Sequence, residues 1–106
     1  MPDRIDKRHT ASYHQFMVQF DWNDEKNEWL KTKRGVCFEQ VVLILEQEGY
    51  LDIIDHPNQR EYPGQEIAIV RIEEYAYLVP FVREGNTIFL KTIIPNRKAT
   101  SKYKGK

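Results

Sequence analysis

The hydrophobic period of this chain changes at Tyr50, and that change limits its fold class more than any other feature. Before Tyr50, apolar residues repeat every three or four positions, which predicts a core-facing helix over residues 38–48. After it, apolar and polar residues alternate and four strands are expected, over residues 50–55, 66–72, 75–82 and 87–94. The last three strands follow one another through short links, which is typical of an antiparallel meander. Helices in one block beside an antiparallel sheet predict an α+β fold.

Two elements are expected before that helix. Alternation of apolar and polar residues over residues 16–22 predicts a half-buried strand. Asn23 is a favourable N-cap for a helix over residues 24–34, and Gly35 is the expected residue at its end. The predicted order is therefore strand, helix, helix and about four strands, followed by a basic C-terminal tail.

Pro80 and the large aromatic residues give more local predictions. Pro80 has no backbone N–H for the strand over residues 75–82, so an edge, a bulge or an irregular pairing is expected there. Trp22, Trp29, Phe38 and Phe89 lie within predicted elements and are assigned to the core.

The size and composition favour one soluble domain. At 106 residues the chain has room for a single core. Residues 1–13 lack periodicity and are expected to be a flexible extension, residues 14–103 the domain, and residues 104–106 a disordered basic end. The longest aliphatic run, Val41–Leu45, is too short to span a membrane, and the first residues lack the apolar region of a secretory signal. The cytoplasm is the expected location.

The Cys and His content indicates chemistry without a metal or other cofactor. Cys37 is the only cysteine, and the three histidines, His9, His14 and His56, do not have the spacing of zinc ligands. We expect no intrachain disulfide and no metal site.

Charge is distributed unevenly along the chain. Residues 91–106 contain six Lys or Arg and no Asp or Glu, which gives +6. The other 90 residues contain ten Lys or Arg and sixteen Asp or Glu, which gives −6. Basic ends of this kind bind phosphate, membrane surfaces or acidic partners.

Two segments, FDWNDEKNEWLKTKRGVCFEQ and IIPNRKATSKY, together resemble the BrnT family of bacterial toxins, small ribonucleases related in fold to RelE and ParE. The family's first pattern is similar at Phe20, Trp22, Lys26, Asn27, Lys33, Gly35, Val36, Phe38 and Glu39, and its closing pattern at Arg97, Ala99 and Thr100. Arg71, in EIAIVR, aligns with an Arg at the end of the family's middle strand. Arg34 stands where the family commonly has His, and Cys37 where it commonly has Ser.

The resemblance implies the toxin of a type II toxin-antitoxin system with a RelE-like fold. Such a toxin is a metal-independent endoribonuclease that binds RNA and is neutralised by a cognate antitoxin, which in some systems carries a ribbon-helix-helix DNA-binding domain. The RNA 2′-hydroxyl attacks the adjacent phosphorus, and Arg and Lys stabilise the charge that grows on the phosphate oxygens.

The candidate site residues follow from this chemistry and from the charge pattern. Residues 97–103 are expected to form one wall of a cleft, and Lys33, Arg34 and Arg71 the other wall. The candidate catalytic residues are Arg97, Arg71, Lys33 and His56, and the candidate RNA-binding residues are Arg34, Arg83, Lys98, Thr100 and Tyr103. Most of them also have a purely structural interpretation: Arg97 as a solvated C-terminal charge, Arg71 and Arg83 in rim ion pairs, Lys33 and Arg34 as charges at a helix C-terminus, His56 in a loop, Thr100 as a cap and Tyr103 packed on the sheet.

Two other functions remain open from the sequence. One is a nucleic-acid or protein-binding module without catalysis, in which the basic tail only adds affinity. The other is a ParE-like toxin that acts on a protein target, because one fold can host several activities.

Overall fold

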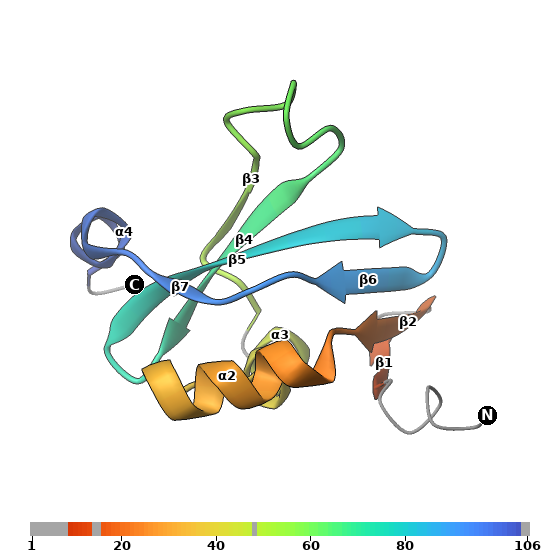
Figure 1. The fold of residues 1–106 in the computed structure, drawn as a ribbon, viewed down its shortest axis with the longest axis horizontal. Coiled ribbons are helices and arrows are strands. Elements are labelled where there is room, and N and C mark those ends of the chain that lie inside the picture. The colour runs from red at the N-terminus through yellow and green to blue at the C-terminus, as the bar shows by residue number, and fades with distance from the viewer. Residues whose placement is uncertain (1–8, 14–15, 48, 105–106) are drawn as a thin grey trace.

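The computed structural model describes the backbone of residues 9–13, 16–47 and 49–104, with side chains from residue 18 onward. Within these residues, one mixed sheet and three helices form an α+β fold (Figure 1). The predicted α+β class is confirmed. In chain order the elements are β1 (His9–Tyr13), β2 (Phe16–Asp21), α2 (Asp24–Arg34), α3 (Phe38–Gln47), β3 (Asp52–Asp55), β4 (Glu66–Ile72), β5 (Tyr75–Glu84), β6 (Thr87–Leu90), β7 (Ile94–Pro95) and α4 (Arg97–Lys102).

Local capping interactions explain where the first two helices begin and end. The side chain of Asn23 accepts a hydrogen bond from the Lys26 N–H at 2.8 Å, and Gly35 ends α2 with a φ of 68°. The N–H of Cys37 donates to Gln40 Oε1 at 2.9 Å, which is one half of a capping box at the start of α3. Both predicted helices are confirmed.

Asn27 connects the two helices through hydrogen bonds that the sequence does not reveal. It is only 4% exposed, and its Oδ1 accepts from the Phe38 N–H at 2.8 Å. Its Nδ2 donates to Glu39 Oε1, also at 2.8 Å. Because the first N–H groups of a helix have no partner inside it, Asn27 caps α3 from the neighbouring helix.

The sheet has the strand order β1-β2-β6-β5-β4-β3, with β7 pairing with β5. Strands β3 to β6 form the predicted antiparallel meander. Strand β2 pairs in parallel with β6, so a segment near the start of the chain lies beside one near its end. Pairing between such distant segments does not follow from local sequence patterns.

Residues 9–13 correct one prediction, because they form strand β1 and not a flexible extension. This strand pairs in antiparallel register with β2, whose other edge is taken by β6. Pairing with β2 supplies the backbone hydrogen bonds that the segment's irregular polarity pattern did not predict. Residues 1–8, which were also predicted to be flexible, lie outside the described residues.

Pro80 lies opposite a bulge, as predicted. Phe81 pairs with Leu90, whereas Leu78 pairs with Ile94, so two residues of β5 face three residues on the other side. The N–H of Lys91 donates to the carbonyl of Pro80 at 2.8 Å. The missing N–H of Pro80 therefore coincides with the break that divides the predicted strand over residues 87–94 into β6 and β7.

The sheet separates a large core from a small one. On the face that we call the α2/α3 face, the two helices pack against alternate residues of β4 and β5, and the buried cluster includes Leu30, Phe38, Val70 and Val79. On the opposite face, the α4 face, the buried residues Ile69, Ala76, Ala99 and Tyr103 form a smaller cluster with partly buried Leu51 and Leu78.

The aromatic residues follow this division only in part. Trp22 and Phe38 are buried and their rings stack with centroids 5.6 Å apart, as predicted. Trp29 is 40% exposed, and Phe89 is only partly buried, so the core prediction is wrong for Trp29 and too strong for Phe89. Leu30 is fully buried. Neighbouring residues of a helix point about 100° apart, so the side chain of Trp29, just before Leu30, turns toward the solvent.

Candidate functional site

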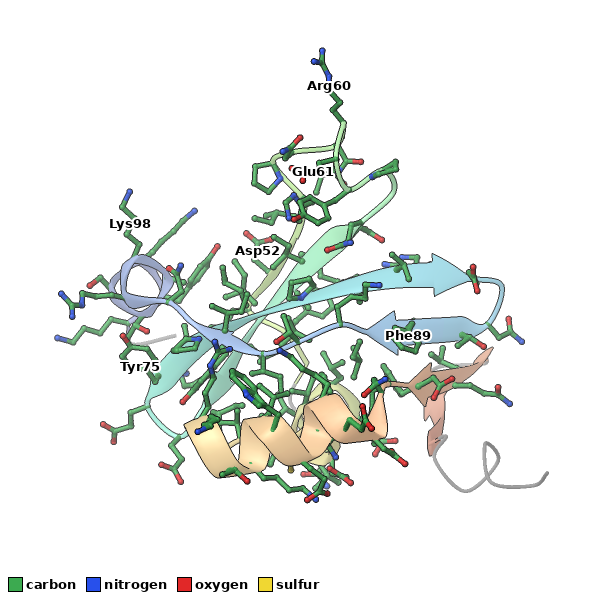
Figure 2. The ribbon with its side chains drawn as sticks, in the orientation of Figure 1. Asp52, Arg60, Glu61, Tyr75, Phe89 and Lys98 are labelled. Atoms are coloured by element: carbon green, nitrogen blue, oxygen red, sulfur yellow. The ribbon has the colours of Figure 1, made fainter. Side chains whose placement is uncertain are left out.

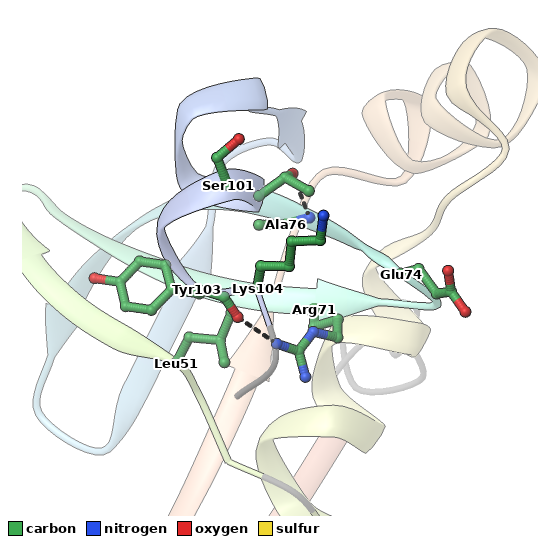
Figure 3. Close-up of a pocket in the computed structure, with 8 residues that line it drawn as sticks. Leu51, Arg71, Glu74, Ala76, Ser101, Tyr103 and Lys104 are labelled. Carbon is green, nitrogen blue, oxygen red and sulfur yellow. Dashed lines mark hydrogen bonds between the residues drawn. The ribbon is translucent and has the colours of Figure 1, made fainter.

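A pocket of about 360 Å³ lies between α4 and the end of the β4–β5 hairpin (Figure 3). We call it the α4 pocket. It is lined by Leu51, Arg71, Glu74, Ala76, Thr100, Ser101, Tyr103 and Lys104. Three of the predicted site residues, Arg71, Thr100 and Tyr103, therefore meet in one place.

Arg71 reaches the C-terminal segment directly. It lies on β4 with its side chain on the α4 face, between the buried residues Val70 and Ile72 of the opposite face. Its Nη2 donates to the backbone carbonyl of Tyr103 at 2.7 Å (Figure 3). A guanidinium presents its N–H donors in a planar fork whose geometry matches the oxygens of a phosphate.

Tyr103 is fixed at both ends. Besides the bond to its carbonyl, its hydroxyl donates to Asp52 Oδ2 at 2.7 Å. This bond raises the pKa of the Tyr103 phenol and lowers the pKa of the Asp52 carboxyl. Only 9% of Tyr103 is exposed, so its ring packs back on the sheet and is not open for stacking on a base.

Thr100 also has a structural role. Its hydroxyl donates to the carbonyl of Asn96 at 2.8 Å and accepts from the N–H of Ala76 at 2.9 Å. The side chain of Asn96 accepts from the Ala99 N–H at 2.7 Å and begins α4. These bonds attach α4 to the edge of β5 and correspond to the local cap that was the alternative to phosphate binding.

Helix α4 places positively charged side chains beside the pocket. Arg97, Lys98 and Lys102 are exposed, and no acidic residue lies in this helix. Arg97 precedes Ser101 by four residues, so the two share one side of the helix at the rim of the pocket. Figure 2 shows Lys98 on the outer side of α4.

Lys104 corrects the prediction of a disordered basic end. Its N–H donates to the Ser101 carbonyl at 3.4 Å, and its side chain lines the α4 pocket. The turn that follows α4 keeps it beside Tyr103. Residues 105–106 of the predicted basic end lie outside the described residues.

Lys33 and Arg34 lie at the end of α2 and do not line the α4 pocket. Arg34 Nη1 donates to the carbonyl of Ile93 at 2.6 Å, just before β7, and its Cζ lies 5.0 Å from the centre of the Trp29 ring. The end of α2 is thus beside the segment that leads into α4, but on the other face of the sheet. The two basic groups do not share one pocket.

His56 and Arg83 lie elsewhere. His56 Nδ1 accepts from the Asn58 N–H at 3.0 Å, and its ring lies 4.4 Å from that of Tyr62, in the β3–β4 loop that projects away from α4 (Figure 1). Arg83 Nε forms an ion pair with Glu66 at 2.6 Å across β4 and β5. Both residues therefore have the structural contacts that were the alternatives to a role in catalysis or RNA binding.

Besides Lys104 and Ala76, four residues of this region were not among the predicted site residues. Glu74 and Ser101 line the pocket, Leu51 contributes an apolar wall, and Asp52 holds the Tyr103 hydroxyl. Ser101 directly follows the matched segment RKAT, which was the one signal that could have identified it. Nothing in the local sequence distinguishes Glu74 from the neighbouring Glu73.

Searches against protein families, curated proteins and solved structures found no match to the chain. Among the described residues, no group of three or more His, Cys, Asp or Glu side chains is placed to hold a metal ion. No helix in the described part of the chain is long and apolar enough to cross a membrane.

Proposed function

We propose that the protein is a RelE-like toxin of a type II toxin-antitoxin system that cleaves RNA without a metal ion. One observation carries the proposal: Arg71 of β4 and the basic segment at the C-terminus, far apart in sequence, meet at the α4 pocket. A phosphodiester bound there would contact Arg71 and Lys104, with Arg97 at the rim. The resemblance of two sequence segments to the BrnT family supports the same function.

The pocket offers a consistent set of roles for this reaction. The 2′-oxygen of the RNA attacks phosphorus while the bond from phosphorus to the 5′-oxygen breaks. Arg71 and Lys104 stabilise the charge on the phosphate oxygens, which is often the largest contribution to catalysis. Among the pocket-lining residues, Glu74 supplies a carboxylate that can accept the 2′ proton, and water protonates the departing 5′-oxygen.

The antitoxin would cover this basic surface. The segment over residues 91–106 carries +6, so an acidic stretch of a partner complements it and blocks the α4 pocket. We propose a cytoplasmic complex of toxin and antitoxin.

Cleavage of RNA in the presence of EDTA tests the proposal. Arg97→Ala removes a rim cation and Arg71→Lys keeps a charge but loses the planar fork, so each variant should cleave about 10²-fold more slowly. Arg60→Ala is the matched control, because Arg60 is an exposed cation at the tip of the β3–β4 loop (Figure 2) and its removal should leave cleavage unchanged. Expression of the wild-type protein or of Arg60→Ala should arrest growth, and expression of Arg97→Ala or Arg71→Lys should arrest it less.

A purified wild-type protein that leaves RNA intact in EDTA would reject the nuclease. Melting curves for each variant separate lost activity from lost fold.

A nucleic-acid-binding module without cleavage is the second candidate. It is favoured by the hydroxyls of Thr100 and Tyr103, which are engaged in structural hydrogen bonds and are not free for proton transfer. If about four cations contact single-stranded RNA, log K should fall against log salt with a slope of about −3. Binding with this slope and intact RNA would select the module.

A further inference from the structure

Trp29 is an exposed aromatic ring in a strongly basic setting. It is 40% exposed, whereas the other tryptophan, Trp22, is 5% exposed. Residues 26–34 contain Lys26, Lys31, Lys33 and Arg34 and one acidic residue, so this stretch carries +3. The two carboxylates of the first turn, Asp24 and Glu25, precede this stretch, and Glu28 within it pairs with Lys31 at 3.1 Å.

Two cations lie close to the Trp29 ring. Lys26 Nζ lies 4.2 Å and Arg34 Cζ 5.0 Å from the ring centre. Arg34 is itself fixed by its 2.6 Å bond to the carbonyl of Ile93. Lys33 follows Trp29 by four residues and so lies on the same side of α2. The ring therefore has a defined position with positive charge close to it.

This setting fits a nucleobase better than an apolar protein surface. Bases stack on aromatic rings regardless of sequence, and the phosphates beside a stacked base pair with nearby Lys and Arg. An apolar partner would have to remove water from the cations around the ring without neutralising them, which is unfavourable.

The position of Trp29 also connects it to the α4 pocket. Arg34 joins the end of α2 to Ile93, and the chain continues through β7 into α4 and Arg97. Tyr75 is 36% exposed, and the centre of its ring lies 5.8 Å from that of Tyr77. Tyr77 pairs with Pro95 of β7. The exposed ring of Tyr75 and the partly buried ring of Tyr77 thus lie on β5, beside the segment that joins Ile93 to α4.

We propose that Trp29 is a stacking platform for one base of single-stranded RNA, with Lys26, Lys33 and Arg34 contacting the flanking phosphates. The strand then crosses the outer edge of β7 and places another phosphate in the α4 pocket. This inference rests on the proposed function, because it assigns the second contact of the same RNA strand.

Binding of an RNA that cannot be cleaved tests the platform separately from catalysis. The probe is a 2′-O-methyl oligouridylate of about 12 nucleotides, at about 0.1 M salt, because the methyl group blocks attack by the 2′-oxygen. Trp29→Ala should weaken binding about 10-fold, and Trp29→Phe should retain most of it. Tyr62→Ala is the matched control, since Tyr62 is an equally exposed aromatic residue, 41%, on the distant β3–β4 loop.

Tryptophan fluorescence gives a second, independent measurement. Binding should quench the emission of the wild-type protein, and the quenching should disappear in Trp29→Phe, in which only the buried Trp22 emits. Circular dichroism of each variant confirms that the fold is retained.

The outcomes distinguish this inference from the function on which it rests. If the wild-type protein cleaves RNA while Trp29→Ala binds the probe equally well, the platform is rejected and the nuclease stands. Quenching that persists in Trp29→Phe also rejects the platform. If the wild-type protein neither binds the probe nor cleaves RNA but captures a peptide through α2, both proposals are rejected.

Discussion

The two faces of the sheet are held together by different kinds of interaction. On the α2/α3 face, two helices bury a continuous apolar cluster that runs from Phe20 to Ile93. On the α4 face, one short helix buries few apolar side chains and is attached mainly by hydrogen bonds of Arg71, Thr100 and Tyr103. The first face therefore supplies most of the buried apolar packing, and the second supplies a site that can change locally.

Truncation of a fully buried leucine should give the largest effect. Leu30→Ala on the α2/α3 face should lower the free energy of unfolding by about 2–5 kcal/mol, because a cavity remains in the packed cluster. Leu78→Ala on the α4 face should cost clearly less, since Leu78 is only partly buried. Urea unfolding of both variants measures the difference, and equal losses would contradict the division between the faces.

Removal of the Asn27 side chain should give the next largest effect. Asn27→Ala leaves the buried Phe38 N–H without its acceptor and should cost about 1–3 kcal/mol. Asn58→Ala, which removes an exposed amide in the β3–β4 loop, is the control and should change little. A thermal melt in which both variants match the wild type would show that Asn27 does not connect the helices.

Tyr103→Phe should loosen α4 without unfolding the α2/α3 face. The bond from Tyr103 holds the pKa of the Asp52 carboxyl below its ordinary value of 3.8. The bond therefore contributes fully to stability above pH 3.8, and this contribution is lost as the pH falls through the lowered pKa of Asp52. The same bond raises the pKa of Tyr103 above 10.0, so the contribution is also lost when the pH rises through that raised value. Between these limits the variant should be less stable than the wild type.

Two measurements check this local effect. Trypsin should cut Tyr103→Phe faster than the wild type after Lys98 and Lys102, while the rest of the chain stays resistant. The difference in melting temperature between the two proteins should shrink as the pH falls below 3.8. A constant difference across this range would exclude the Asp52 bond as its cause.

Cys37→Ser should give the smallest effect. Gln40 already accepts from the Cys37 N–H, and a hydroxyl is a better cap than a thiol, so stability should rise by a few tenths to about 1 kcal/mol. Burial raises the pKa of the Cys37 thiol, so it is neutral at pH 7 and the change replaces one neutral group by another. If Cys37→Ser has the same melting temperature as the wild type, the side chain of residue 37 does not cap α3.

Local signals in the sequence predicted where helices and strands lie better than they predicted side-chain burial and the pairing of distant strands. Asn23 and Gly35 gave the limits of α2, because caps depend on a few neighbouring residues. The exposure of Trp29 was not predictable, since it depends on which side of α2 the sheet covers. The parallel pairing of β2 with β6 was missed for a similar reason, because no short pattern encodes contact between distant strands.

The candidate site was predicted to a similar extent. Arg71 and the C-terminal segment were expected to converge and do so, because strand alternation and the short links of the meander fix both positions. The expected contribution of Lys33 and Arg34 to the same cleft depended on the side of the sheet that α2 occupies. Since α2 packs on the opposite face, these residues meet the basic tail only around the edge formed by β7.

The parallel pairing of β2 with β6 has a consequence for synthesis of the chain. Strand β6 lies between β2 and β5, so the hairpin of β1 and β2 cannot join the sheet until Leu90 has left the ribosome. Contacts between such distant segments also slow folding. The growing chain therefore completes its sheet only after β6 has emerged and its basic pocket only after Lys104 has emerged, so a product truncated before these residues would lack the activity that we propose.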